Sequence, residues 1–198
     1  MVKKQVEDLI NDLPSLEILE AELSRQKYKS RYGKVLKSTV YTLVTVAAIA
    51  VLVATLWMPV FQVVGSSMTP TLSDTEIVVC LKSKQFSTGD IVAFYFNNKV
   101  LVKRVIAKAG DWVDINEYGE VTVNGNLIDE PYIDEPAFGD CDIELPYQVP
   151  ENKYFVMGDH RSVSIDSRNS SVGCIVDDDI VGKIKYCVWP LSDIGSVR

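Results

Sequence analysis

The chain has 198 residues, a net charge of −7 at pH 7 and a single histidine, His160. Residues 1–59 carry eight basic and six acidic side chains, whereas residues 60–198 carry twelve basic and twenty-one acidic ones, so the net charges are +2 and −9. An acidic domain does not favour a nucleic-acid partner, because phosphate backbones are bound by Lys and Arg. We expect no metal and no other cofactor, because no Cys-x-x-Cys or comparable ligand spacing occurs.

The first segment, residues 1–37, has leucines and isoleucines at roughly helical spacing with acidic residues between them. Pro14 is typical of the first turn of a helix, so it marks the expected start of a second helical piece. We interpret residues 1–37 as a cytoplasmic helical segment. It could bind a partner protein, or it could pack on itself or on the bilayer.

The second segment is an apolar run that predicts a transmembrane helix over residues 38–59. No charged residue occurs between Lys37 and Asp74, and Val40 to Met58 are nineteen mostly apolar residues. A helix of this length is about 28 Å long, close to the thickness of a hydrocarbon core of roughly 30 Å. A cleavable secretory signal is the alternative, but such signals have shorter apolar cores that lie nearer the N-terminus.

The charges that flank the apolar run predict its orientation. Six basic residues precede it, whereas the first charges after it are Asp74 and Glu76. Basic residues remain on the cytoplasmic side and attract anionic lipid, so we expect a single-pass plasma-membrane protein with a cytoplasmic N-terminus. Residues 60–198 then form an extracytoplasmic domain. The six basic residues are Arg25, Lys27, Lys29, Arg31, Lys34 and Lys37.

The third segment is rich in Val, Ile, Phe and Tyr in short runs separated by Gly, Asn, Asp and Pro, and this pattern predicts a mainly β, antiparallel domain. Asn124-Gly125 predicts a tight hairpin turn, because both residues tolerate positive φ. Residues 130–150 are acidic and contain four prolines, so we expect a surface loop. The expected strands are 61–64, 76–81, 90–96, 100–107, 112–116, 120–123, 154–157 and 180–189.

Four motifs occur in order along this domain. Residues 67–72 read Ser-Met-Thr-Pro-Thr-Leu shortly after the apolar run, and residues 89–94 read Gly-Asp-Ile-Val-Ala-Phe. Residues 102–106 read Val-Lys-Arg-Val-Ile, and residues 158–168 begin Gly-Asp-His-Arg. Together with the apolar run, these motifs resemble the bacterial type I signal peptidases over most of residues 37–190. Those proteins are membrane-anchored serine proteases with a Ser/Lys dyad.

The resemblance implies roles for individual residues. Ser67 matches the nucleophile and Lys103 the general base, while Ser164 matches a serine that orients the lysine amine. Asp159, Arg161, Asp166 and Arg168 match a structural ion-pair network around the loop that carries Ser164. The substrate pockets would be lined by Phe61, Val63, Leu72, Leu101 and Val102.

The residue chemistry is consistent with these roles. A serine hydroxyl needs a base, and a lysine with the usual pKa of about 10.4 is protonated at pH 7, so Lys103 has to be buried to become neutral. Leu101, Val102, Val105 and Ile106 flank it in the sequence. Without the motif, Lys103 would be interpreted as a surface lysine on an alternating strand. Arg104 could not replace it, because a guanidinium does not deprotonate in proteins.

Two residues depart from the family pattern. His160 stands where the family usually has Asn, which raises a Ser-His pair as an alternative to the dyad. Gly65 stands where some members have a serine whose hydroxyl completes the oxyanion hole. The hole would then use the backbone N–H of Ser67 and a second donor that the sequence leaves open. The sequence also leaves open whether any of the four cysteines pair as disulfides, namely Cys80, Cys141, Cys174 and Cys187.

The resemblance implies that the substrates are membrane-tethered preproteins with Ala-x-Ala-like signal peptides, and that the lipid bilayer is the other partner. Two other functions remain as alternatives. A non-catalytic assembly factor, such as a pilus-type chaperone, would keep the fold and the anchor but would not need both Ser67 and Lys103. A self-cleaving Ser/Lys protease would use the same dyad on a related β fold without a membrane span.

Overall fold

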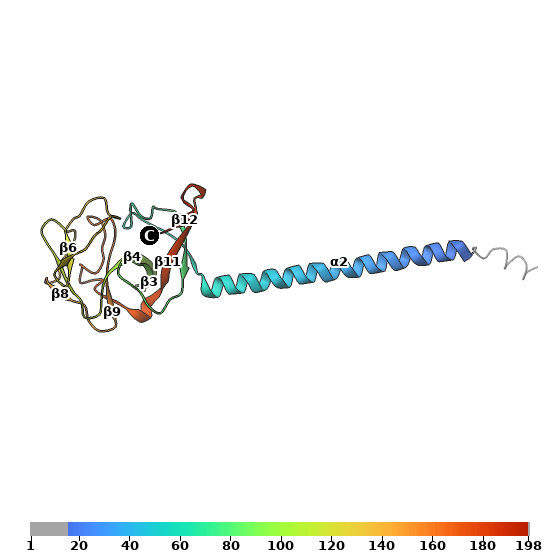
Figure 1. The fold of residues 1–198 in the computed structure, drawn as a ribbon, viewed down its shortest axis with the longest axis horizontal. Helices are drawn as coiled ribbons and strands as arrows, with labels where there is room; N and C mark the ends of the chain where they lie inside the picture. The colour runs from blue at the N-terminus through green and yellow to red at the C-terminus, as the bar shows by residue number, and fades with distance from the viewer. Residues whose placement is uncertain (1–15, 198) are drawn as a thin grey trace, which may run out of the picture. The chain divides into compact units, whose positions relative to one another are not determined.

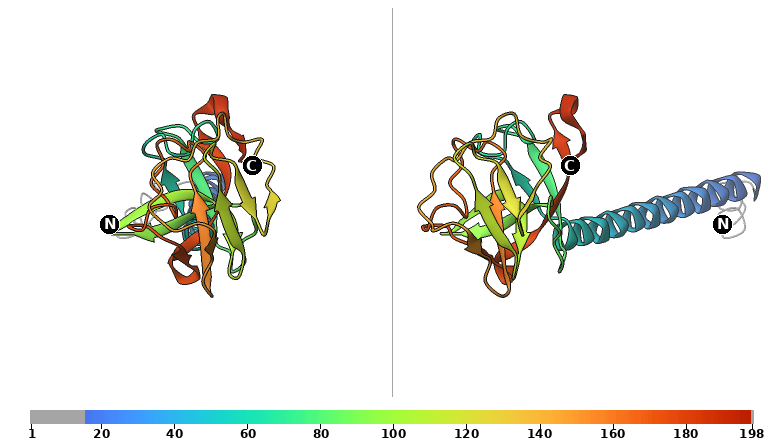
Figure 2. Two further views of the ribbon diagram at one scale, coloured as in Figure 1. Left: turned by 90° about the vertical axis from the view of Figure 1, so that its left-hand side faces the viewer. Right: turned by 60° about the vertical axis from the view of Figure 1, so that its left-hand side comes forward.

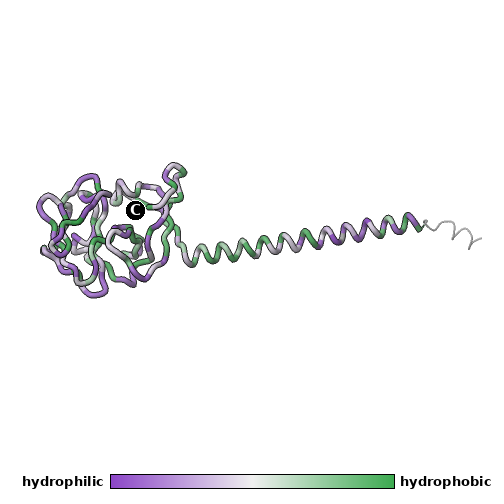
Figure 3. The backbone as a smooth tube through the Cα atoms, viewed as in Figure 1, coloured by the Kyte–Doolittle hydropathy of each residue, from purple (hydrophilic) through white to green (hydrophobic). Residues whose placement is uncertain are grey.

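The computed structural model describes residues 16–197, and its first element is one long helix, α2 (Leu16–Trp57) (Figure 1). The helical expectation for the leucines and isoleucines before residue 16, and for Pro14, lies outside the described residues. Figure 3 shows that hydrophilic residues are frequent in the N-terminal half of α2 and that its C-terminal half is mainly apolar. The helix therefore continues without a break from the basic segment into the apolar run.

Threonines inside the apolar part of α2 bond to the helix itself. The hydroxyls of Thr39, Thr42 and Thr45 donate to the carbonyl oxygens four residues earlier, at 3.0, 2.9 and 2.8 Å. These bonds satisfy polar groups that would be costly to leave unpaired in hydrocarbon. The helix is long and apolar enough to cross a membrane.

The rest of the chain forms a compact β unit with a larger sheet of eight strands (Figure 2). All pairs in this sheet are antiparallel, in the order β1-β2-β11-β3-β4-β9-β10, with β12 beside β11. Its strands are β1 (Val60–Gln62), β2 (Ile77–Leu81), β3 (Ile91–Phe96), β4 (Lys99–Lys108), β9 (Lys153–Met157), β10 (Ile175–Val176), β11 (Ile180–Trp189) and β12 (Gly195–Ser196).

A smaller antiparallel sheet has the order β7-β6-β5-β8. The hairpin expected at Asn124-Gly125 is confirmed, because these residues connect β6 to β7 with φ values of 53° and 77°. Its strands are β5 (Trp112–Ile115), β6 (Val121–Val123), β7 (Asn126–Leu127) and β8 (Tyr147–Gln148). Two short 3-10 helices, η1 (Asp177–Asp179) and η2 (Leu191–Asp193), flank β11.

The expected fold class, a single apolar N-terminal helix followed by antiparallel β structure, is confirmed. The longest expected strand, 180–189, has the observed bounds of β11, and the others differ at their ends by one or two residues. The two-residue strands β8, β10 and β12 were not predicted. The region 130–150 is mostly loop, as expected, although it contains β8.

One of three core clusters lies directly beneath the motif that contains Ser67. It combines Met68 and Leu72 from that motif with buried residues of β2, β3 and β11. Apolar neighbours of the serine are therefore part of the core that holds the larger sheet together. The central strand β4, which carries Lys103, lies between β3 and β9 in the same sheet.

Candidate active site

Ser67 lies in the segment that connects β1 to β2. Thr75 N–H donates to Val63 O at 2.9 Å and closes the base of this segment. Met68 and Leu72 are buried, and Leu72 N–H donates to Met68 O at 2.8 Å. These contacts fix the backbone on both sides of Ser67, whose own side chain remains partly exposed.

Lys103 lies near the middle of β4, opposite Val92 of β3. It is only 3% exposed, and its Nζ lies 2.6 Å from Ser67 Oγ. None of the ion pairs among the described residues includes Lys103. The structure therefore brings together the serine and the lysine, which are 36 residues apart in sequence.

Burial lowers the pKa of Lys103 from 10.5 to about 8, because an ammonium ion loses its hydration in an apolar setting. The negative charges of Asp166 and Asp159 oppose this change, and the positive charge of Arg168 adds to it. At a pKa near 8, about a tenth of the lysine is neutral at pH 7. A neutral amine at this position can accept the Ser67 proton.

A small cleft of about 110 Å³ opens beside these two side chains. Four of the five residues expected to contact substrate line it, whereas Leu72 does not and is fully buried in the core. The lining residues are Phe61, Gln62, Val63, Val64, Ser67, Met68, Val100, Leu101, Val102 and Lys103.

Ser164 is buried beside Gly158. A Cβ on Gly158 would overlap Ser164 Oγ and the carbonyl oxygen of Ser67, so only glycine permits this close approach. Ser164 Oγ has no hydrogen-bond partner among the described residues, so the bond expected from it to Lys103 is not formed in this structure. His160, two residues after Gly158, donates its backbone N–H to Ser67 O at 3.1 Å.

The loop around Ser164 is held by a fully buried pair between Asp166 and Arg168. Asp166 accepts from Arg168 Nε and from its terminal nitrogen at 2.9 and 2.8 Å, and from Gly158 N–H at 2.9 Å. Arg168 also donates to the carbonyl oxygens of Phe138 and Arg161, both at 2.9 Å. This pair therefore connects the end of the loop to its beginning at Gly158 and Arg161.

The other two residues of the expected network have partners that the sequence reasoning missed. Asp159 accepts from Arg104 Nε and a terminal nitrogen at 2.9 and 2.6 Å. Arg161 binds Glu130 through both terminal nitrogens, one of them at 2.9 Å. One signal was available, because Arg104 stands in an apolar strand and a buried guanidinium requires a carboxylate.

The His160 ring contacts the serine segment without contacting the serine. Its Nδ1 lies 2.9 Å from Thr69 Oγ1 and 3.2 Å from Ser66 O. Because Thr69 Oγ1 itself donates to Ser66 O, both groups are available as acceptors for an Nδ1–H. No hydrogen bond joins this ring to Ser67 Oγ among the described residues, so the geometry does not support a Ser-His pair.

The Ser67 backbone N–H is available as an oxyanion donor, because none of the described residues accepts a hydrogen bond from it. Gly65 precedes it with a φ of +94° and donates its N–H to Asp74 Oδ1 at 2.7 Å. A serine at position 65 would be strained at this φ. The backbone therefore explains why glycine occupies this position, and the second oxyanion donor stays open.

The cysteines are all free thiols in this structure, and burial raises the pKa of Cys80 and of Cys174 to about 11. In residues 16–197 no cluster of three or more His, Cys, Asp or Glu side chains could hold a metal ion.

Residues 36–189 match the protein family described as Signal peptidase, peptidase S26. The chain is 33% identical to signal peptidase I of Bacillus amyloliquefaciens over 167 residues, which cover 79% of this chain and 89% of the relative. It is 30% identical to signal peptidase I U of Bacillus subtilis (strain 168), with 83% and 94% covered. It is 37% identical to signal peptidase IB of Staphylococcus aureus (strain COL), with 67% and 78% covered.

A solved structure of a signal peptidase I from Enterococcus faecalis V583 is 26% identical, with a TM-score of 0.43, and the match covers 50% of this chain and 96% of the other. The family match extends over most of the β unit and the C-terminal part of α2. The chain therefore belongs to the signal peptidase family, peptidase S26, and is a serine endopeptidase that removes signal peptides.

Proposed function

We propose that Ser67 and Lys103 are the catalytic dyad with which this peptidase cleaves preproteins. The observation that carries the proposal is the 2.6 Å distance between Ser67 Oγ and Lys103 Nζ, at a lysine that is buried and outside the ion pairs. A lysine in such a setting is disfavoured as an ammonium ion, so its burial has a chemical use only if it serves as a base.

The reaction begins when neutral Lys103 accepts the proton of Ser67 and Ser67 Oγ attacks the scissile carbonyl carbon. The Ser67 backbone N–H donates to the developing oxyanion. The ammonium of Lys103 then donates its proton to the leaving amine, and the mature protein departs. Lys103 next takes a proton from water, whose oxygen attacks the acyl carbon of the acyl-enzyme. Lys103 returns this proton to Ser67 Oγ as the ester bond breaks, and the signal peptide leaves with a free carboxyl group.

The cleft supports a preference for Ala-x-Ala-like sites in membrane-tethered preproteins. Its small volume of about 110 Å³ suits small side chains. Strand β1 forms one end of the larger sheet, so an extended substrate can add to it as a further strand. Phe61 and Val63 would then contact the side chains that point toward the dyad.

The membrane arrangement is part of the same proposal. Residues 38–59 span the plasma membrane once, residues 1–37 are cytoplasmic, and residues 60–198 form the extracytoplasmic peptidase domain. The uncharged run inside α2 and the basic residues that precede it support this orientation. An extracytoplasmic dyad would meet the signal peptide where it emerges from the bilayer.

The test of the dyad is cleavage of a model preprotein by the full-length protein in detergent. We expect Ser67→Ala and Lys103→Ala to abolish cleavage, and Lys103→Arg to remain inactive because its guanidinium stays protonated. The matched controls are Ser66→Ala, next to the nucleophile, and Lys99→Ala, an exposed lysine of the same strand. Cleavage by Lys103→Ala near the wild-type rate would overturn the mechanism.

The test of orientation is digestion of intact spheroplasts with an added protease. We expect the region after Pro59 to be degraded and residues 1–37 to be protected. Protection of the β unit in intact spheroplasts, with degradation only after lysis, would reverse the proposed topology.

A further inference from the structure

The segment of residues 130–134, called the strap here, lies outside the strands and outside the four sequence motifs. Its first residue, Glu130, is nearly buried and binds both terminal nitrogens of the buried Arg161. Glu130 also accepts a hydrogen bond from Tyr132 Oη at 2.8 Å. Burial and the neighbouring carboxylate raise the pKa of Tyr132, so its hydroxyl remains a donor. The strap is therefore fixed to the loop that begins at Gly158.

Tyr132 contacts the residue adjacent to Lys103. Its ring lies under the Arg104 guanidinium, with 3.7 Å between the guanidinium carbon and the ring centroid. Arg104 is 2% exposed and also donates to Gly89 O at 2.9 Å and to Asp159. A cation–π contact with a desolvated guanidinium is among the stronger interactions of this kind. Tyr132 thus covers one face of a buried cation beside the lysine.

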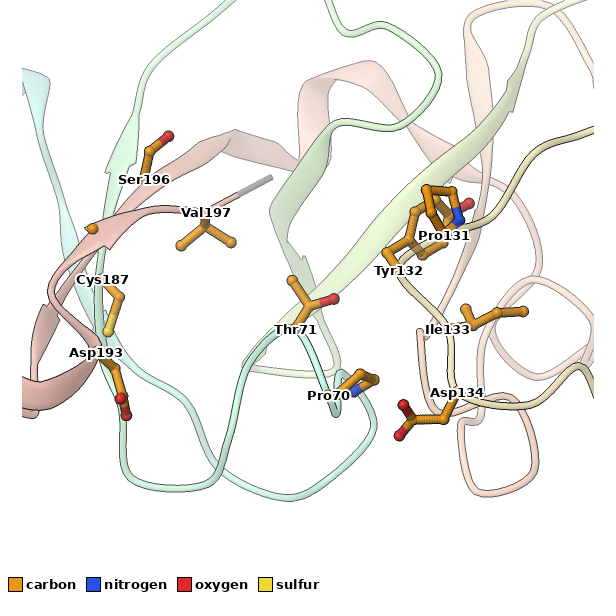
Figure 4. A pocket seen from close by; sticks show the side chains of 11 residues that line it. Pro70, Thr71, Pro131, Tyr132, Ile133, Asp134, Cys187, Asp193, Ser196 and Val197 are labelled. Carbon is orange, nitrogen blue, oxygen red and sulfur yellow. The ribbon is translucent and has the colours of Figure 1, made fainter.

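The same cation connects the strap to the serine segment. Asp159, the carboxylate bound to Arg104, accepts a hydrogen bond from Thr71 Oγ1 at 2.5 Å, and the next residue, His160, donates its backbone N–H to Ser67 O. Pro70 and Thr71 line a cavity of about 530 Å³ together with residues 131–134 of the strap (Figure 4). One connection from the strap to the serine segment therefore runs from the Tyr132 ring to the Arg104 guanidinium and on to Asp159.

We infer that Tyr132 and Glu130 are positioning residues of the dyad, which they act on through Arg104 and Arg161. This inference rests on the proposed roles of Ser67 and Lys103. Tyr132 holds Arg104, and therefore the β4 backbone next to Lys103, while Glu130 holds Arg161 and the loop that contacts Ser67 O. Neither residue lines the cleft beside the dyad. Their loss should consequently affect the chemical step more than substrate binding.

The pH profile provides a readout that a purely structural role would not change. The charged groups that act on Lys103 are Asp166 and Asp159, which favour its ammonium form, and Arg168, which disfavours it. Removing the Tyr132 ring would admit water next to Arg104 and Asp159 and weaken the desolvation of Lys103. The acidic limb of kcat/KM should therefore move to higher pH.

The experiment measures kcat, KM and the pH profile of the full-length protein in detergent with a signal-peptide substrate. We expect Tyr132→Leu to lower kcat at least tenfold with little change in KM and to shift the limb upward. Tyr132→Phe keeps the ring over Arg104 and should retain most of the activity. The matched control is Tyr118→Leu, an exposed tyrosine in the turn between β5 and β6.

If Tyr132→Leu does not fold, Glu130→Gln provides the test, because it removes the charge beside Arg161 and should also lower kcat at unchanged KM. A folded Tyr132→Leu or Glu130→Gln variant with wild-type kcat and limb would overturn the inference, and so would a change confined to KM. Lys103→Ala in the same assay separates the two proposals. If it is inactive while the strap variants are normal, only the positioning role fails; if it is active, the dyad fails.

Discussion

The burial of Lys103 makes a quantitative prediction for the pH dependence of cleavage. With a pKa of about 8, its neutral fraction is about 1% at pH 6, about 9% at pH 7 and about 91% at pH 9. Because only the neutral amine can accept the Ser67 proton, kcat/KM should rise about tenfold from pH 6 to pH 7 and again about tenfold from pH 7 to pH 9. It should then reach a plateau.

The assay is the initial rate of cleavage at low substrate concentration, with a signal-peptide substrate that has no titrating group between pH 6 and pH 10. The His160→Gln variant distinguishes the two possible bases, because an ordinary histidine titrates near pH 6.5. We expect its acidic limb to stay near pH 8, since the His160 ring does not contact Ser67 Oγ. A limb near pH 6.5 that disappears in His160→Gln would refute the assignment of Lys103 as the base.

The remaining predictions concern stability. The folded-state pKa of Lys103 lies below its unfolded value, so the unfolded state binds more protons between about pH 8 and pH 10.5, and the unfolding free energy should rise across that window. Below pH 8 the buried ammonium of Lys103 lowers the unfolding free energy by about 3 kcal/mol. Lys103→Met should therefore unfold at a higher denaturant concentration than wild type at pH 7, and the difference between the two midpoints should become smaller toward pH 10.5. Equal midpoints at pH 7 would contradict this. Gly158→Ala should lower kcat, and it should lower the unfolding free energy by about 1–3 kcal/mol, because the added methyl group overlaps Ser164 and Ser67 O. Gly195→Ala should change neither quantity, because Gly195 has open space around it. Gly65→Ala should cost about 1–2 kcal/mol through backbone strain alone, and an unchanged melting temperature would show that its φ is not positive in solution.

The long strands could be predicted from the sequence because each has enough residues for a pattern. Strand β11 has ten residues, and its bounds were predicted correctly. Strands β8, β10 and β12 have two residues each, which is too short for an alternating hydrophobic pattern to be recognised in the sequence. These short strands form because neighbouring strands already present an edge to pair with. Their existence depends on tertiary structure rather than on local preference.

The candidate site shows the same division between local and long-range information. Ser67 and Lys103 were chosen from motifs, and the fold places them in contact. The partners of the buried charges could not be chosen in this way, because Asp159 binds Arg104 across 55 residues and Arg161 binds Glu130 across 31. A sequence indicates that a buried charge needs a partner of opposite charge, but which residue is that partner depends on how the chain folds.

The pairing of these charges explains how a neutral lysine can exist beside so many carboxylates. An unpaired carboxylate near Lys103 would stabilise the ammonium ion and raise the pKa of the base. Each nearby buried carboxylate is instead bound to a guanidinium, which cannot deprotonate and so cancels much of the negative field at every working pH. Desolvation then becomes the largest influence on the Lys103 pKa. Arg168 lowers the Lys103 pKa directly, whereas Asp166 and Asp159 raise it. On this reasoning the pairing of Asp166 with Arg168 and of Asp159 with Arg104 holds the loops and also limits the effect of these carboxylates on the lysine.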